Sequence, residues 1–234
     1  MGILYNRFNP QEDIFLLPYS NKSKVITYLT PDNFKGSDST VWGDEYAQPM
    51  NRDSSKASWE LSSDGKSVHI YNLSSSINSL IISAPSNLYN FTVYIVAQYA
   101  GDDIKLYTRG NNSRVAYIFY DTSKAVGTTN LGSIFSNWTS NCYNYFNGHT
   151  AYGTFKAYAI SHPRNDKSVH ILDNSVRTFS TANSSYYPVN FYFSGAQSTI
   201  GEAYIKFLAI VSEAESSTVL QNNINFIREK LNLT

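Results

Sequence analysis

Val189-Asn-Phe-Tyr-Phe-Ser-Gly195 and Ile200-Gly-Glu-Ala-Tyr-Ile-Lys-Phe-Leu-Ala-Ile-Val211 are two apolar segments near the end of the chain, and both predict β-strands. A polar tail follows them directly, and its apolar residues recur at the spacing of one helical face. These residues are Leu220, Ile224, Ile227 and Leu231. The tail is therefore predicted to form an amphipathic helix that buries its apolar side against the preceding sheet.

This C-terminal helix is expected over residues 212–232. Ser212, with Glu215 three residues later, matches a capping box, in which the hydroxyl and the carboxylate each satisfy a backbone N–H of the first helical turn. The helix would then begin directly after the last strand.

The order of elements at this end of the chain is similar to that of a known family. A glycine-bearing strand, a last long strand of the form Gly201-Glu-x-x-Ile205, an acidic turn and a closing helix resemble the end of laminin-G-like, concanavalin A-type domains. Upstream, Lys167-Ser-Val-His-Ile-Leu-Asp-Asn-Ser-Val-Arg-Thr-Phe179 resembles the hairpin of that family, with an Asn-containing turn. The resemblance covers residues 152–231 and implies a jelly-roll sandwich.

The rest of the chain also shows short strand patterns separated by turn signals. The clearest hairpin joins residues 57–61 to residues 67–71 through Asp64-Gly65, because glycine accepts the positive φ of a tight turn. Residues 90–98 alternate in the manner of a central strand. We therefore predict a mainly β fold, an antiparallel β-sandwich of the concanavalin A-like jelly-roll type with a C-terminal amphipathic helix.

The N-terminal segment has a different character from the rest. Residues 1–20 contain the apolar run Ile14-Phe-Leu-Leu17 near Pro10 and Pro18. We expect this segment to be an edge strand or an arm used for anchoring or oligomerisation, and residues 21–234 to form the sandwich with its closing helix.

Charge and composition exclude several classes of function. The chain has 18 Lys plus Arg against 18 Asp plus Glu, without a dense basic run, which disfavours nucleic-acid binding. No segment approaches the roughly 18 apolar residues needed for membrane insertion. Charged residues make up 15% of the chain, while Tyr, Asn and Ser are abundant. Such a surface suits neutral sugars, and it also suits packing in a large assembly.

No catalytic signature is present in the sequence. The chain lacks a Gly-x-Ser-x-Gly elbow, a phosphate-binding glycine loop and a His-Glu-x-x-His helix. Glu60 and Glu202 lie on separate predicted strands, which favours two unrelated solvent-facing carboxylates over a catalytic pair. We therefore expect a protein that is not an enzyme and has no cofactor. Asp102 and Asp103 are candidate calcium ligands, which the resemblance to laminin-G-like domains implies because rim loops of that family sometimes hold calcium.

The first candidate binding site is the segment 121–151, which gives little strand signal and is rich in aromatic and amide side chains. Aromatic rings can pack on the apolar face of a sugar while amides bond its hydroxyls. The alternative is that these rings only pin the loop to the sandwich, and Trp42 and Trp59 are predicted to belong to the core. The glycan-binding candidates are Trp138, Tyr143, Asn144, Tyr145, Asn147 and His149.

The apolar N-terminal arm and the composition rich in Tyr, Asn and Ser resemble those of bacteriophage appendage or decoration proteins. The start of the chain lacks the order of a secretory signal, and a virion protein made in the host cytoplasm reaches the outside by lysis. We expect a homo-oligomeric virion surface protein that binds host-surface or mucosal glycan and contacts other virion proteins through its N-terminal arm. The alternatives are a purely structural capsid or tail component, a glycoside hydrolase, and an extracellular bacterial adhesin.

Overall fold

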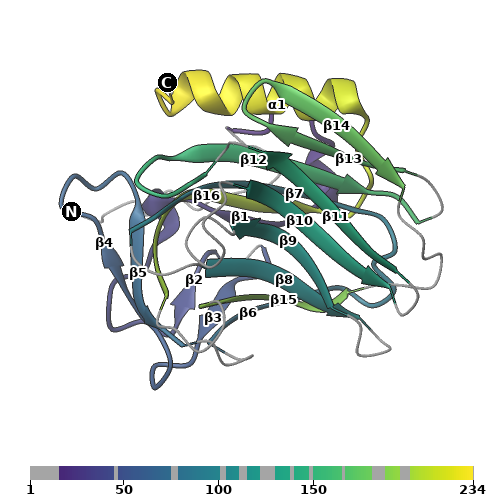
Figure 1. Ribbon diagram of the computed structural model, residues 1–234. Helices are drawn as coiled ribbons and strands as arrows, with labels where there is room; N and C mark the ends of the chain where they lie inside the picture. Colours follow the sequence, from purple (N-terminus) through teal and green to yellow (C-terminus); the bar gives the residue numbers. More distant parts are fainter. Residues whose placement is uncertain are drawn as a thin grey trace.

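Two antiparallel β-sheets pack face to face, and a C-terminal helix lies on the outer side of one of them (Figure 1). This arrangement comes from a computed structural model of the chain. For the strands between residues 104 and 147 it describes mainly the backbone. The residues described are 16–44, 47–74, 79–100, 104–110, 115–121, 130–137, 140–147, 150–164, 167–180, 188–195 and 201–233.

The sheet beneath the helix is named sheet A. Its strands in spatial order are β14 (Ser175–Ser180), β13 (Lys167–Leu172), β12 (Lys156–His162), β7 (Phe91–Tyr99), β16 (Gly201–Val211), β5 (Val68–Leu73) and β4 (Ser58–Leu61). An additional strand, β1 (Val25–Leu29), pairs with the C-terminal half of β16. Short 3-10 turns at Lys22–Lys24 and Pro31–Asn33 flank β1.

The second sheet is named sheet B. Its strands in spatial order are β11 (Ser140–Asn147), β10 (Asn130–Asn137), β9 (Val115–Asp121), β8 (Ile104–Gly110), β15 (Pro188–Gly195), β6 (Leu80–Ser83), β3 (Met50–Arg52) and β2 (Val41–Trp42). The two C-terminal strands expected from the sequence are thus β15 and β16, one in each sheet. The predicted antiparallel β-sandwich is confirmed.

A large apolar core fills the space between the sheets. Trp42 and Trp59 are both fully buried there, with ring centroids 6.3 Å apart in an edge-to-face arrangement, and Phe34 packs edge-on against each of them. The indole N–H of Trp59 donates to the carbonyl of Ser39 at 2.9 Å, which satisfies its buried polar atom. The prediction that both tryptophans belong to the core is confirmed.

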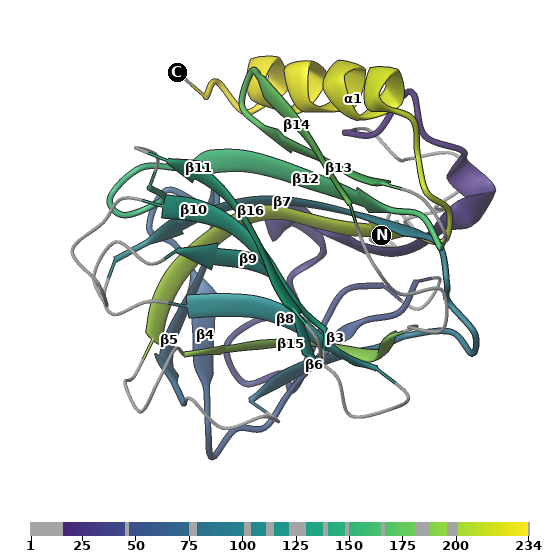
Figure 2. The same ribbon diagram turned by 45° about the vertical axis from the view of Figure 1, so that its right-hand side comes forward.

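The helix α1 (Ser217–Lys230) covers part of the outer face of sheet A, where it contacts β12 and β13 (Figure 2). Leu220, Ile224 and Ile227 are buried beneath it, and Leu231 packs against the same cluster, as the helical spacing predicted. Leu16 and Leu17 belong to this cluster too. The last part of the N-terminal segment therefore packs beneath the chain's own helix, while residues 1–15 lie outside the described residues.

The predicted capping box at Ser212 is wrong. The helix begins later, and its N-cap is Ser216, whose side chain accepts from the backbone N–H of Val219 at 3.3 Å. Ser212 instead donates its hydroxyl to the carbonyl of Lys24 at 2.9 Å, beside β1. Glu215 is buried and accepts from the hydroxyl of Tyr94 on β7. Both expected capping side chains are therefore used in tertiary contacts, which pattern matching along one segment does not detect.

The expectation of a long loop over residues 121–151 is also wrong. Most of this segment forms the antiparallel pair β10 and β11, with Asn130 opposite Asn147 and Asn137 opposite Ser140. Phe146 on β11 is buried and packs edge-on against Tyr158 of sheet A, so the pair contributes to the core. The strand signal was weak because these strands are rich in Asn, which is depleted in strands. Strand formation here depends on pairing with neighbouring strands, which the local sequence does not show.

Candidate functional site

The helix covers only one half of the outer face of sheet A. Both views place α1 over the β12–β14 end of the sheet and leave β4 and β5 uncovered by it (Figures 1 and 2). On this uncovered half the outward positions carry aromatic, imidazole and carboxylate groups, which we call the open patch. It consists of Glu60 on β4, His69 and Tyr71 on β5, and Glu202 and Tyr204 on β16.

Strand register brings these side chains together. His69 lies directly opposite Glu60 on one neighbouring strand and opposite Tyr204 on the other. Because successive side chains of a strand point to opposite faces, the adjacent residues Trp59 and Ile70 enter the core. The alternation that buries the core therefore sets the patch residues in a row on the outer face.

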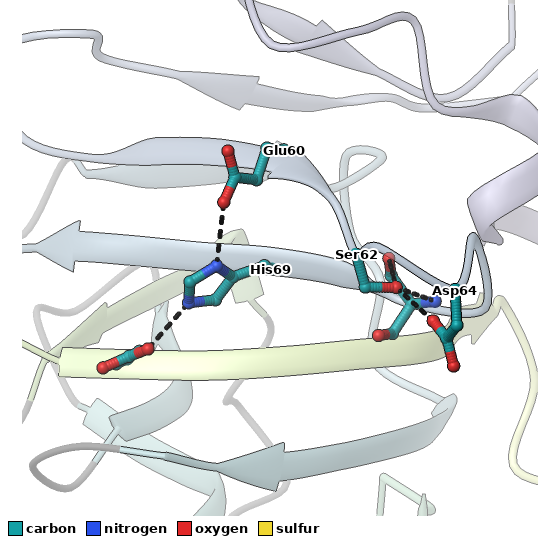
Figure 3. Close-up of polar contacts among 6 residues, drawn as sticks. Glu60, Ser62, Asp64 and His69 are labelled. Carbon is teal, nitrogen blue, oxygen red and sulfur yellow. Dashed lines mark hydrogen bonds and ion pairs between the residues drawn. The ribbon is translucent and has the colours of Figure 1, made fainter.

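The imidazole of His69 lies between two carboxylates. Its Nδ1 is 3.2 Å from Oε1 of Glu60, and its Nε2 is 2.8 Å from Oε1 of Glu202 (Figure 3). The side chain of His69 is 16% exposed, whereas those of Glu60 and Glu202 are 49% and 37% exposed. A carboxylate offers about four acceptor positions, so acceptor capacity on both glutamates faces the solvent.

Two tyrosines flank the imidazole. The ring of Tyr204 is stacked on that of His69, with centroids 4.3 Å apart and planes 5° from parallel. The ring of Tyr71 lies 5.0 Å from the same imidazole at an angle of 31°. Both tyrosines are partly exposed. Packed rings of this kind give a binding surface that loses little side-chain entropy when it takes up a ligand.

A β-bulge lies beside Glu202. Gly201 pairs with Leu73 and Ala203 pairs with Ile70, so two residues of β5 oppose the single residue Glu202. One of them, Asn72, has φ +54°, a conformation that a non-glycine residue adopts at a cost. Bulges commonly re-aim a side chain next to a site. Here the bulge accompanies the approach of Glu202 to His69 across the strand pair.

The β4–β5 hairpin tip borders the patch and is held rigidly. Asp64 accepts from the Ser62 hydroxyl at 2.7 Å and from the backbone N–H of Lys66 at 3.0 Å (Figure 3). The Ser62 hydrogen bond, followed by that of Lys66, lowers the pKa of Asp64 below its ordinary value. Gly65 has φ +69°, so the Asp-Gly turn signal in the sequence is confirmed.

A lysine marks the boundary between the patch and the helix-covered half. Lys206 on β16 lies with Nζ 4.3 Å from the ring centroid of Phe155, which packs against the apolar cluster beneath α1. Partial burial lowers its pKa, an effect that nearby Asp64 opposes. Positive charge therefore lies beside the open patch, on the side of the hairpin tip and the helix.

Within the described part of the chain, no group of three or more His, Cys, Asp or Glu side chains is arranged to hold a metal ion. In the open patch both imidazole nitrogens already bond to carboxylates. The calcium candidates Asp102 and Asp103 lie outside the described residues, so that suggestion stays a prediction. A further finding on the described residues is that none of their helices has the length and apolar character to cross a bilayer.

The glycan-binding residues predicted from the sequence lie elsewhere. Trp138 and His149 fall outside the described residues. The other four are on β11, at the edge of sheet B, with Tyr143 opposite Ile134 and Tyr145 opposite Gly132. Asn144 and Asn147 pair with Ser133 and Asn130. Their backbone positions are described and their side chains are not, so a site there also stays a prediction.

The open patch could not be predicted from the sequence as a site, although both of its glutamates lie on predicted strands. Glu60 and Glu202 were expected to be unrelated, and the structure brings both to one imidazole. The usable signal was local: Glu60 and His69 are the outward residues of the predicted hairpin, next to core-facing Trp59 and Ile70. The pairing of β5 with β16 could not be found in this way, because it joins distant parts of the chain.

The fold defines the chain as an antiparallel β-sandwich domain. No protein-family model matches the chain, and no curated protein matches it in sequence. Solved structures do match in fold. The botulinum neurotoxin type G receptor binding domain is 10% identical with a TM-score of 0.57, over 86% of this chain and 51% of that one.

Two further solved structures extend the comparison. Trypanosoma rangeli sialidase in complex with sialic acid is 9% identical with a TM-score of 0.58, over 91% of this chain and 34% of that one. The binding domain of Paraclostridial Mosquitocidal Protein 1 is 10% identical with a TM-score of 0.56, over 87% of this chain and 52% of that one. The chain thus spans about half, or a third, of the length of these structures, and the likeness concerns the fold.

Proposed function

We propose that this protein is a non-catalytic, lectin-like glycan-binding module and that the open patch is its binding site. The observation that carries the proposal is the imidazole of His69 bonded on both sides to Glu60 and Glu202 while stacked on Tyr204. This cluster lies on the half of sheet A that α1 leaves uncovered, where a ligand can reach it.

The chemistry of the patch suits a sugar. The C–H face of a pyranose is apolar and packs on aromatic rings such as Tyr71 and Tyr204, while its hydroxyls donate to acceptors at the rim. Glu60 and Glu202 supply charged acceptors, which form hydrogen bonds roughly twice as strong as neutral ones. Because His69 holds both carboxylates in place before a ligand arrives, less side-chain freedom is lost on binding.

The same geometry favours binding over hydrolysis. Glycoside hydrolases place two carboxylates on either side of the scissile bond, about 5–10 Å apart, with the sugar between them. In the open patch the space between Glu60 and Glu202 is filled by the His69 ring, which bonds to both. Both ring nitrogens are thereby occupied, so neither is available to a substrate as a general base. This geometry supports a site that binds a glycan without cleaving it.

The comparisons give this proposal support at the level of fold. The neurotoxin domain and the mosquitocidal protein domain are described as binding domains, and the sialidase is described in complex with sialic acid. At identities near 10% they support a sandwich of a kind used for glycan or receptor binding. The finer laminin-G-like resemblance rests on the C-terminal motifs quoted from the sequence.

The biological setting we propose is the surface of a bacteriophage particle, where the module would recognise a host-surface or mucosal glycan. In its support, the chain has few charges and abundant Tyr, Asn and Ser, which suits packing in a large assembly. In this setting residues 1–15, which precede the buried pair Leu16 and Leu17, would contact other virion proteins or other copies of the chain. Cofractionation with particles after mild dissociation would test this part.

Glycan-array binding of the purified chain tests the main proposal. Tyr204→Ala should weaken binding at least about tenfold, because it removes the stacked ring and frees His69. Tyr19→Ala is the matched control, since this tyrosine is 53% exposed and lies beside α1, where its backbone N–H donates to Oδ1 of Asn223. A double variant, Trp138→Ala with Tyr145→Ala, tests the site predicted on β11. Loss in the double variant alone would place the glycan there and contradict the open patch, and no binding by the folded wild type would contradict the function itself.

A further inference from the structure

We propose that the open patch selects sugar residues without a negative charge and discriminates against those that carry a carboxylate, such as sialic acid. This inference rests on the proposed function and specifies the ligand class of the same site. It goes beyond the fold comparison, in which one matching structure was solved with sialic acid bound.

The charge balance of the patch is negative in either state of its histidine. Glu60 and Glu202 each carry a carboxylate, and the ion pairs of both among the described residues are made with His69. Ionised carboxylates only accept, so an imidazole that bonds to both must donate from both nitrogens and carry a positive charge. A neutral imidazole bonds to both only if one carboxylate is protonated, and in either case one negative charge remains. An arriving carboxylate would therefore meet a net charge of its own sign, and such juxtaposition is a recognised source of discrimination between ligands.

The charged groups around the patch do not reverse this balance. Lys66 and Lys206 lie near Asp64, which interacts with both at the hairpin tip. Lys206 also lies over the ring of Phe155, toward the helix. Positive charge is thus displaced to one side and partly matched by a third carboxylate, while Glu60 and Glu202 border His69 directly.

The hydrogen-bonding groups of the patch point to the same ligand class. Sites for anionic sugars use arginine or clustered backbone N–H groups, which donate to the ligand carboxylate. The charged groups that the open patch leaves for a ligand are carboxylates, which only accept when ionised, because both nitrogens of His69 are already used by Glu60 and Glu202. Hydroxyls of an uncharged sugar donate readily to such acceptors. A sugar ring bound over His69 and Tyr204 would have one carboxylate acceptor on each side, at Glu60 and at Glu202.

Paired glycans that differ only in a terminal sialic acid provide the test. The wild type should bind the neutral member about tenfold more tightly than the sialylated one, as expected for partly screened like charges. In the double variant Glu60→Gln with Glu202→Gln the preference should fall to within about threefold. Glu229→Gln, which removes an exposed carboxylate on α1, is the matched control for net charge and should keep the preference.

A second measurement needs no variant. Raising the salt from about 50 mM to about 500 mM shortens the Debye length, so the preference of the wild type should narrow. Equal or tighter binding of the sialylated glycan, lost in Tyr204→Ala, would overturn the inference and leave the proposed function standing. A folded protein that binds neither member of any pair would overturn both.

Discussion

The Nε2 atom of His69 lies 2.8 Å from Oε1 of Glu202, although the two residues are 133 positions apart in the chain. The contact spans the neighbouring strands β5 and β16 and depends on the register in which the last strand enters sheet A. The same imidazole reaches Glu60 on its other side. The geometry of the proposed site therefore depends on the order and register of the strands in sheet A.

Replacing His69 by Phe should weaken glycan binding at least about tenfold and leave the fold intact. The variant keeps a ring beside Tyr204 and removes both bonds to the glutamates, which then repel each other and lose their fixed positions. Because Glu60 and Glu202 are well exposed, these ion pairs contribute less than about 1 kcal/mol to stability. Calorimetric titration and thermal unfolding would separate the two effects, and unchanged affinity would argue against the positioning role of His69.

Replacing Glu215 by Gln should maintain or raise stability near neutral pH. The carboxylate is buried beside Tyr94, and burial raises its pKa above the ordinary value. With a raised folded pKa, the group's contribution is fully present below the unfolded value of 4.5 and is lost as the pH rises through the folded value. Gln carries no charge and can still accept from the tyrosine, so its advantage should grow with pH.

The contrasting variant is Glu215→Ala, which leaves the buried hydroxyl of Tyr94 without this acceptor. It should cost about 1–3 kcal/mol below pH 4.5 and less as the pH rises, because the wild type itself loses the contribution of the carboxylate there. Urea unfolding at pH values on both sides of 4.5 would measure both variants. A Gln variant that loses as much stability as the Ala variant near neutral pH would show that the carboxylate itself is required.

Local patterns in the sequence were enough to predict the sandwich and several of its parts. The face of α1, the hairpin around Gly65 and the burial of Trp42 and Trp59 all follow from periodicity or turn chemistry acting within short segments. Each of these features is set mainly by residues close in sequence.

The parts that could not be predicted depend on distant neighbours. Glu215 does not cap the helix because Tyr94, on a strand 121 positions away, takes its carboxylate. The β10–β11 pair forms although it is rich in Asn, which is depleted in strands, and Phe146 of this pair finds a core contact in Tyr158. His69 and Glu202 meet through strand order, which one sequence does not reveal. The helix start and the open patch were therefore missed for the same physical reason.

Gly43 should tolerate substitution less well than Gly36. Both have positive φ, +123° and +100°, so alanine at either position is strained. A Cβ at Gly43 would also lie 2.9 Å from Cδ2 of Leu29 and 3.3 Å from the Cα of Pro49, whereas a Cβ at Gly36 meets nothing within 4 Å. We expect Gly36→Ala to cost about 1–2 kcal/mol and Gly43→Ala about 2–4 kcal/mol. Chemical unfolding would measure both, and equal losses would show that β2 and its loop shift to make room.

Acidification should destabilise the protein through its buried histidines. His170 is fully buried between the hydroxyls of Tyr158, at 2.8 Å from Nδ1, and Ser168, at 2.9 Å from Nε2. Burial, with a smaller effect of His162, lowers the pKa of His170 to about 3. Burial likewise lowers the pKa of His162 to about 4.

For a group with a depressed folded pKa, the contribution to stability is present above the unfolded value and is lost as the pH falls toward the folded value. The free energy of unfolding should therefore fall between about pH 6.5 and about pH 4, by on the order of 1 kcal/mol per pH unit for each histidine. His170→Gln, which keeps a polar group and does not titrate in this range, should flatten the slope. Both proteins should be compared in the Glu215→Gln background, which removes the opposing change from that carboxylate. If the double variant loses stability with falling pH as steeply as Glu215→Gln alone, His170 takes up no additional proton on unfolding.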